Sequence, residues 1–204
     1  MCAVPAFAEE QGMDPYEALK LLREGNARYT NMEFERPHIS KEILNELANG
    51  QHPFAVIIAC SDSRVPLEHI FDAGIGDLFE IKNAGNVIDN HVTGSVEYAV
   101  SHLGVKLVIV MGHTSCGGIK TAVEHPKHQT KQINSIMDSV KPAIELAKKQ
   151  RGDFNTNVTK NNAVLGAQAL TKDKVIKDYV EDHGVVIIPA MYDLKTGKVE
   201  FYTK

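Results

Sequence analysis

The chain has 204 residues, of which 43% are hydrophobic, so it is long enough to bury a core of its own, and we expect a single domain. Its 22 Lys and Arg face 26 Asp and Glu, giving a formal net charge of −4. The basic surplus that phosphate binding needs is missing, so we expect no nucleic-acid partner. No apolar run approaches the ~20 residues that span a bilayer, so we expect no membrane partner. Three cysteines are too few for a disulfide framework.

The first residues leave the compartment open. Residues 3–8 (AVPAFA) are small and apolar and precede Glu9 and Glu10, which resembles the end of a secretory signal cleaved after Ala8. The basic and long apolar regions of such a signal are absent. The segment is therefore either the remnant of a longer precursor or an ordinary N-terminal arm. Accordingly, the expected location is the cytoplasm, or the periplasm or exterior if residues 1–8 end a signal peptide.

The first predicted element is an amphipathic helix. Asp14 is a good N-cap, Pro15 suits the first helical position, and Glu17 completes a capping box, so we expect a helix to about Tyr29. A polar extended segment follows. We assign residues 1–40 to an N-terminal helical arm and the remainder, 41–204, to an α/β core.

The rest of the chain alternates between two hydrophobic periods. Helical spacing predicts helices at 41–48, 66–73, 93–103 with Thr93 as N-cap, 117–124, 133–150 and 163–181. Apolar or alternating runs predict strands at 54–59, 78–82, 107–111 and 185–188, and a hairpin or strand pair within 191–202. The polar, Asn-rich stretch 151–162 reads as a loop. Continuous apolar strands separated by helices indicate a mainly parallel sheet flanked by helices, with ligands at the carboxyl ends of the strands.

Two of the predicted strands end in residues that bind soft metals. The run 54–59 stops at Cys60, which Asp62 and Arg64 follow, and the run 107–111 leads into His113 and Cys116. Zinc accepts thiolate, imidazole and carboxylate in a tetrahedron, and catalytic sites supply three protein ligands. Water or Asp62 could take the fourth position.

A bland interpretation competes with the metal site. Buried structural cysteines and a hydrogen-bonded turn histidine are each commoner than a ligand when seen alone. The conjunction at two strand ends, close to an Asp–Arg pair, favours the metal site. A zinc finger is disfavoured because the two halves lie far apart in sequence and each follows a core strand.

Several ordered motifs resemble the β-class carbonic anhydrases. They are CSDSRV at 60–65, GDLFEIKNAGN at 76–86, SVEYAVSHLGVK at 95–106 and GHTSCGG at 112–118. The similarity runs from the first helix to the terminal DLKTGKVEFY. It implies reversible hydration of carbon dioxide to bicarbonate and a proton by a hydroxide on zinc, one Zn²⁺ per chain.

The resemblance also assigns roles to the two strand ends. It implies that Cys60, His113 and Cys116 hold the zinc and that Asp62 and Arg64 form a catalytic pair. In closed members of the family the aspartate joins the metal, whereas in open ones it pairs with the arginine. The sequence does not decide which of the two holds here.

The plant-type subgroup adds residues that would bind the substrate. Gln51, Phe79 and Tyr98 match its glutamine, phenylalanine and tyrosine, and the tyrosine can come from the neighbouring subunit. Val65 and Gly117 are further candidates beside the metal ligands.

The resemblance extends to assembly, and one departure from the family is visible. The family implies a homodimer or a dimer of dimers in which the N-terminal arm embraces the partner. Lys82 stands where the family usually has arginine before NAGN, so a planar bidentate contact would be lost there. The departure leaves the metal site itself unaffected.

Two other functions remain to be weighed. Some relatives hydrolyse carbon disulfide or carbonyl sulfide with the same fold and ligands. A non-catalytic zinc-binding protein is the second alternative, although Asp62, Arg64 and Gln51 argue against it because a closed structural site needs none of them.

Overall fold

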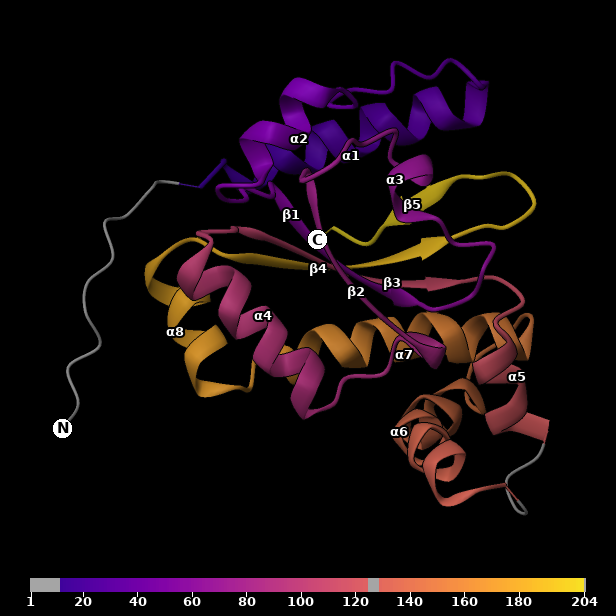
Figure 1. Ribbon diagram of the computed structural model, residues 1–204. Coiled ribbons are helices and arrows are strands. Elements are labelled where there is room, and N and C mark those ends of the chain that lie inside the picture. Colours follow the sequence, from indigo (N-terminus) through magenta and orange to yellow (C-terminus); the bar gives the residue numbers. More distant parts are fainter. Residues whose placement is uncertain (1–11, 125–128, 204) are drawn as a thin grey trace, which may run out of the picture.

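The computed structural model describes residues 12–124 and 129–203, so the leader-like segment 1–8 and Cys2 lie outside the described residues. A five-stranded sheet with the order β2-β1-β3-β4-β5 forms its centre (Figure 1). The strands are β1 (Ala55–Cys60), β2 (Leu78–Asn83), β3 (Leu107–His113), β4 (Val186–Tyr192) and β5 (Val199–Phe201). All pairs are parallel except β4 with β5. The predicted mainly parallel α/β fold is therefore confirmed.

Helices cover both faces of this sheet. They are α1 (Pro15–Asn31), α2 (Lys41–Leu47), α3 (Leu67–Ile70), α4 (Asn90–His102), α5 (Gly117–Glu124), α6 (Lys131–Ala147), α7 (Phe154–Leu170) and α8 (Lys174–Asp182), with a 3₁₀ turn η1 (Ala84–Asn86). Figure 1 shows α1, α2 and α3 on one side of the sheet and α4, α7 and α8 on the other. The helices α5 and α6 lie beyond the end of the sheet, where they enclose a separate small apolar cluster.

The two central strands bring the predicted site together. Every residue of β1 and of β3 is buried, as their continuous apolar sequences predicted. The strands pair in parallel, with Ala59 opposite Met111, so Cys60 and His113 lie at the same end of the sheet, the carboxyl end of the strands. The carboxyl ends of β1 and β3 are thus the place at which a ligand site forms.

The first helix begins as predicted but belongs to the core of its own chain. Two backbone N–H groups donate to the Asp14 side chain, which confirms it as the N-cap. The inner face of α1, including Ala18 and Leu22, packs into the cluster above the sheet. Its outer face exposes apolar side chains, of which Tyr16 is 67% exposed. The helix α1 is therefore packed on one side and exposed to solvent on the other.

Three sequence-based assignments were wrong. The helix α4 begins earlier than expected because Asp89 and not Thr93 is its N-cap, accepting the N–H groups of His91 and Val92. The stretch 151–162 is largely helical, since α7 starts at Phe154 under the Asp153 cap. Its asparagines have modest helix propensity, which burial against the sheet overrides. The expected helix 163–181 is interrupted, because Asp173 caps a new helix, α8.

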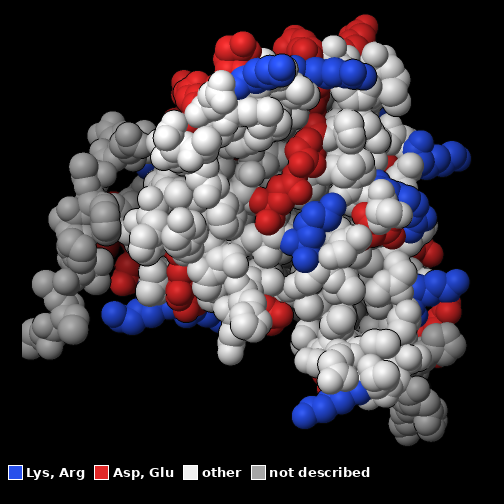
Figure 2. Space-filling model, viewed as in Figure 1, with Lys and Arg blue, Asp and Glu red and all other residues white. Residues whose placement is uncertain are grey.

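The surface carries charges of both signs. In the view of Figure 2, acidic and basic side chains lie together over α1 and α2, where Lys20 and Glu24 form an i,i+4 ion pair. Within the described ranges, the structure has no helix of the length and apolarity required to cross a membrane.

Candidate metal centre

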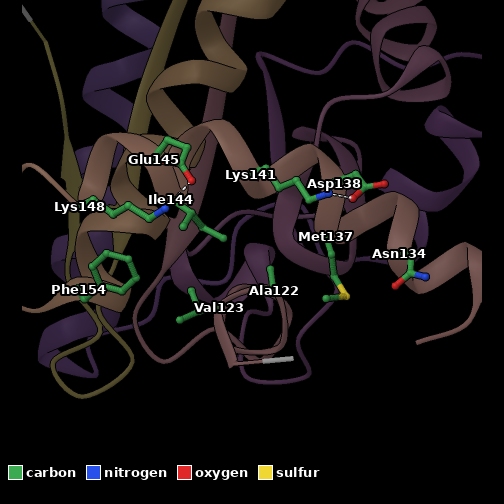
Figure 3. Close-up of a pocket in the computed structure, with 10 residues that line it drawn as sticks. All are labelled: Ala122, Val123, Asn134, Met137, Asp138, Lys141, Ile144, Glu145, Lys148 and Phe154. Carbon is green, nitrogen blue, oxygen red and sulfur yellow. Dashed lines mark hydrogen bonds and ion pairs between the residues drawn. The ribbon is translucent and has the colours of Figure 1, made fainter. Parts of the chain in front are cut away.

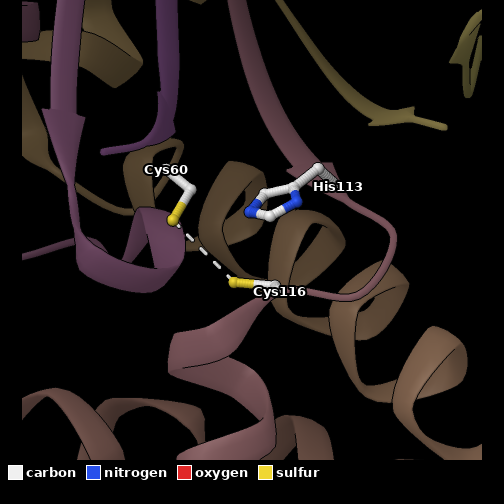
Figure 4. A group of neighbouring side chains, drawn as sticks. All are labelled: Cys60, His113 and Cys116. Atoms are coloured by element: carbon white, nitrogen blue, oxygen red, sulfur yellow. Dashed lines mark hydrogen bonds between the residues drawn. The ribbon is translucent and has the colours of Figure 1, made fainter. Parts of the chain in front are cut away.

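The predicted ligands meet in space. The sulfur atoms of Cys60 and Cys116 and a ring nitrogen of His113 lie within 4.8 Å of one another, and all three residues are buried. Figure 4 shows the three side chains pointing toward a common centre from the end of β1, the end of β3 and the start of α5. The parallel pairing of β1 and β3 thus brings together Cys60 and His113, which lie fifty-odd positions apart in the sequence.

A tight turn sets the spacing of His113 and Cys116. Ser115 adopts φ 54°, a left-handed conformation that reverses the chain between the two ligands. The Thr114 N–H donates to the Tyr192 carbonyl at 2.9 Å, and the Thr114 hydroxyl accepts from the Leu194 N–H at 2.9 Å. The neighbouring strand β4 therefore holds the turn in place.

The orientation of His113 leaves one nitrogen for a metal. Its Nδ1 lies 2.9 Å from the Thr114 carbonyl, a contact in which the ring N–H donates. This bond leaves a lone pair on Nε2, which is buried and has no hydrogen-bond partner in the described part of the chain. A buried nitrogen with an unused lone pair beside two sulfurs fits zinc, and backbone anchoring of the other ring nitrogen is typical of zinc-binding histidines.

The two cysteine side chains form a hydrogen bond with each other. The Sγ atoms lie 3.8 Å apart, with Cys116 donating to Cys60. That hydrogen bond lowers the pKa of Cys60 to about 4 in spite of burial, and His113 and the Gly85 N–H act in the same direction. The same contact, together with burial, raises the pKa of Cys116. The contact thus favours the thiolate form at Cys60, which is the form of cysteine that binds metals.

Asp62 is bound to Arg64 and not turned into the ligand triangle. Its two carboxylate oxygens accept from Nε and from a terminal nitrogen of Arg64 at 2.9 and 2.8 Å. This fork lowers the pKa of Asp62. Arg64 also donates to the Ser115 carbonyl at 3.3 Å, which ties the pair to the turn. One Asp62 oxygen remains 3.8 Å from Nε2 of His113, at the edge of the site.

The predicted substrate residues lie elsewhere in the chain. Phe79 on β2 pairs with Val56 on β1, and Val56 lies four positions before Cys60. Phe79 is therefore roughly 13 Å from the carboxyl end of the sheet, where the ligands lie. Its ring lies 6.2 Å from that of Tyr98, which is 45% exposed. Gln51 is exposed and precedes the amino end of β1. Within one chain, these three residues are not brought to the ligand triangle.

Two other candidates lie closer. Gly117 is the first residue of α5 and directly follows the ligand Cys116. Val65 is buried in the cluster above the sheet, and its carbonyl accepts from the Lys82 ammonium group. Lys82 thus reaches the segment that follows Arg64 with a single contact.

Sequence reasoning missed one contact to the ligands. The N–H of Gly85, in η1, donates to Sγ of Cys60 at 3.3 Å. Gly85 has φ 76°, which glycine adopts without strain. The only signal in the sequence is a glycine within NAGN directly after a strand, which predicts a turn but not its partner.

A separate groove lies away from these residues. It has a volume of about 830 Å³ and lies among α5, α6 and Phe154 at the start of α7 (Figure 3). The charged side chains on its rim already pair with each other, Lys141 with Asp138 and Lys148 with Glu145. None of the predicted site residues lines it.

Comparisons with known proteins agree with this geometry. Residues 55–199 match the carbonic anhydrase family model. The chain is 36% identical over 193 residues to a carbonic anhydrase of Mycolicibacterium smegmatis, covering 92% of this chain and 93% of that protein.

Solved structures give the same answer. The β-carbonic anhydrase CcaA superposes with a TM-score of 0.75 at 26% identity, over 92% of this chain and 93% of that one. One of two tetrameric β-carbonic anhydrases from Sordaria macrospora gives 0.73 at 25% identity, over 93% and 96%. A carbon disulfide hydrolase shares the fold, with a TM-score of 0.53, but only 18% of the sequence. With its Cys60–His113–Cys116 centre at the end of a parallel sheet, this chain belongs to the β-class carbonic anhydrases.

Proposed function

We propose that this protein is a zinc enzyme that interconverts carbon dioxide and bicarbonate. One observation carries the proposal: three soft ligand atoms lie within 4.8 Å of one another, beside a carboxylate that an arginine holds away from them. A structural zinc site is closed by four protein ligands, whereas a catalytic one keeps a position open. Three converging ligand atoms, with the nearby carboxylate held by Arg64, support the catalytic form.

Zinc, when bound, supplies Lewis acidity that can bring the pKa of water down to around 7 and so provide a nucleophile at neutral pH. Cys60 and Cys116 contribute two negative charges that offset the charge of the cation. We therefore expect weaker acidity than a three-histidine site gives, and activity that increases toward alkaline pH.

Asp62 and Arg64 decide whether the open position stays open. The arginine fork occupies both carboxylate oxygens, so the carboxylate is kept from the metal and remains ionised. An ionised Asp62 at the edge of the site can accept a hydrogen bond from a reacting hydroxyl group. Arg64 therefore acts on the reaction through Asp62.

A second subunit would complete the substrate pocket. Gln51, Phe79 and Tyr98 match family pocket residues yet lie toward the opposite end of the sheet in their own chain. A two-fold symmetric dimer can place residues of one chain against the site of the other. We propose such a dimer, or a pair of dimers, since related structures include tetramers.

The decisive experiment is carbon dioxide hydration measured against pH on protein of known zinc content. We expect about one zinc per chain and a rate that rises from pH 7 to 9, with Asp62→Ala strongly impaired. Near-stoichiometric zinc without hydration even above pH 8 would overturn the proposal. Sulfide release from carbon disulfide, measured on the same samples, tests the hydrolase alternative, which requires strong release with negligible hydration.

A further inference from the structure

The turn η1 touches the metal centre through a single backbone group. The N–H of Gly85 donates to Sγ of Cys60 at 3.3 Å, and both partners are buried. A hydrogen bond to a thiolate withdraws charge from the sulfur and thereby adjusts what the sulfur gives to a metal. The position of this N–H therefore matters for the electronic character of the centre.

Gly85 by itself is a poor support for that bond. Its φ of 76° lies in a region that only glycine adopts freely, and glycine is the residue that rotates most easily about its backbone bonds. The N–H and the carbonyl of Gly85 lie on either side of these rotatable backbone bonds. A group that fixes the carbonyl side also limits where the N–H can point.

Asn162 is that group. Its side-chain Nδ2 donates to the Gly85 carbonyl at 2.9 Å, although the two residues lie 77 positions apart in the sequence. Asn162 is 6% exposed and projects from the middle of α7, a 17-residue helix packed against the sheet. Gly118 closes the other side, since a Cβ there would lie 3.2 Å from the Gly85 nitrogen. The turn is thus clamped between α5 and α7.

We propose that Asn162 is a positioning residue for the metal centre, acting through Gly85 on the Cys60 sulfur. The inference rests on the proposed zinc site, because the hydrogen bond has consequences for chemistry only when the thiolate holds a metal. Nothing in the sequence motif that contains the ligands includes α7. Besides the apolar packing of Val158 and Leu165 in the cluster that contains Cys60 and Cys116, this relay gives α7 a hydrogen-bonded route to the centre.

The test compares Asn162→Leu with the parent and with a matched control. Leucine has a similar size but donates no hydrogen bond, so the Gly85 carbonyl loses its anchor. Asn161→Leu is the control: Asn161 is the preceding residue on α7, is 8% exposed, and donates to the Ala143 carbonyl and to Gln150. It removes buried and part-buried side-chain hydrogen bonds of the same helix without touching η1.

The first readout is spectroscopic and independent of turnover. Each protein is loaded with Co²⁺, and the near-ultraviolet thiolate-to-cobalt charge-transfer band is recorded. Losing an N–H···S bond raises the energy of the sulfur lone pairs, so Asn162→Leu is expected to move the band to longer wavelength. Asn161→Leu is expected to leave it at the parental position.

The second readout is zinc affinity, measured by competition with a chelator. Outer-shell partners of metal ligands typically change affinity about 10- to 100-fold. We expect a loss of about 10-fold for Asn162→Leu and less than about 2-fold for Asn161→Leu, with similar falls in melting temperature for both. If Asn162→Leu does not fold, Asn162→Ala takes its place in both measurements.

The outcomes separate the two proposals. A parental band and parental affinity in a folded Asn162 variant would overturn the role of Asn162, whatever the activity. Equal changes in both variants would do the same, because they would reflect stability alone. A parent protein that binds neither zinc nor Co²⁺ would instead overturn the proposed function.

Discussion

The two ends of the parallel sheet differ in how far one chain completes them. At the carboxyl end, Cys60, His113 and Cys116 are buried and converge within 4.8 Å of one another, and Asp62 is already fixed by Arg64. Toward the amino end, the predicted substrate residues are spread over a loop, an edge strand and a helix surface. Tyr98 there is 45% exposed, and its ring contacts the rings of Phe79 and His102.

The two ends of the sheet differ because metal ligands and substrate contacts place different demands on the structure. Ligands must be held within a few tenths of an ångström of their positions, which the rigid ends of buried strands provide. Residues that contact an uncharged substrate can be supplied by another chain, because the contact needs an apolar surface and few bonds. One chain assembles the ligand residues at the carboxyl end of the sheet but leaves the predicted substrate residues apart. This is the pattern expected of an enzyme whose sites lie at a subunit boundary.

The largest effect is expected from a substitution among the ligand residues at the carboxyl end of the sheet. Cys60→Ser removes a ligand and the acceptor of the Gly85 N–H. We expect loss of bound zinc and a fall in hydration well beyond the about 10- to 100-fold typical of outer-shell changes. Metal analysis and hydration assays on the same preparation check this, with Cys2→Ser as the control. Full zinc content in Cys60→Ser would show that the ligand set is wrong.

A smaller effect is expected from the Arg64 fork. Arg64→Ala removes both bonds to Asp62 and the contact to the Ser115 carbonyl. Hydration should fall about 10- to 100-fold while zinc content is kept. Arg64→Lys retains the charge but not the planar fork, so it should recover part of the rate. Unchanged activity in the alanine variant would remove the pair from the mechanism.

Mixing Cys60→Ser with Gln51→Ala tests whether Gln51 serves the site of a partner chain. Cys60→Ser is expected to lack the metal, and Gln51→Ala to lack a predicted substrate contact. If each site draws on two chains, randomly reassembled dimers regain about a quarter of the intact sites, because half are mixed and each mixed dimer has one complete site. Activity no higher than the mean of the two parents would mean that Gln51 serves its own chain or none.

The smallest effect concerns the stability of the protein and arises at Glu80, on the strand β2 that also carries Phe79. Burial, with Glu68 nearby, raises the pKa of Glu80 on β2 from 4.5 to about 7. A carboxyl whose pKa is higher in the folded state favours unfolding once it ionises, so the free energy of unfolding should fall as pH rises from 4.5 through about 7.

Glu80→Gln removes this dependence. It should therefore be more stable than the parent by roughly 1 to 2 kcal/mol at pH 8 and little changed at pH 4.5, the full shift being reduced by solvent screening. Urea unfolding at both pH values checks the sign, with the exposed Glu46→Gln as control. An equal effect at both pH values would contradict the assignment.

Much of the fold was predictable because its signals are local. Continuous apolar runs predicted the central strands β1 and β3, and Asp14 with Pro15 predicted the start of α1. The prediction failed where burial opposed local preference. Residues 154–162 form the first half of α7 although their asparagines suggested a loop, because packing on the sheet outweighs helix propensity.

The sequence by itself determined the kinds of ligand and the edge of the sheet on which they lie, because residue type and strand direction are written locally. Only the tertiary structure decided three other matters. It paired Asp62 with Arg64, placed Asn162 against the turn that contacts Cys60, and kept Phe79 and Tyr98 apart from the ligands. The contact of Asn162 and the separation of Phe79 and Tyr98 from the ligands depend on distances between segments far apart in the chain, which no local pattern encodes. The pairing of Asp62 with Arg64 is local, but the sequence left open whether Asp62 takes this partner or the metal.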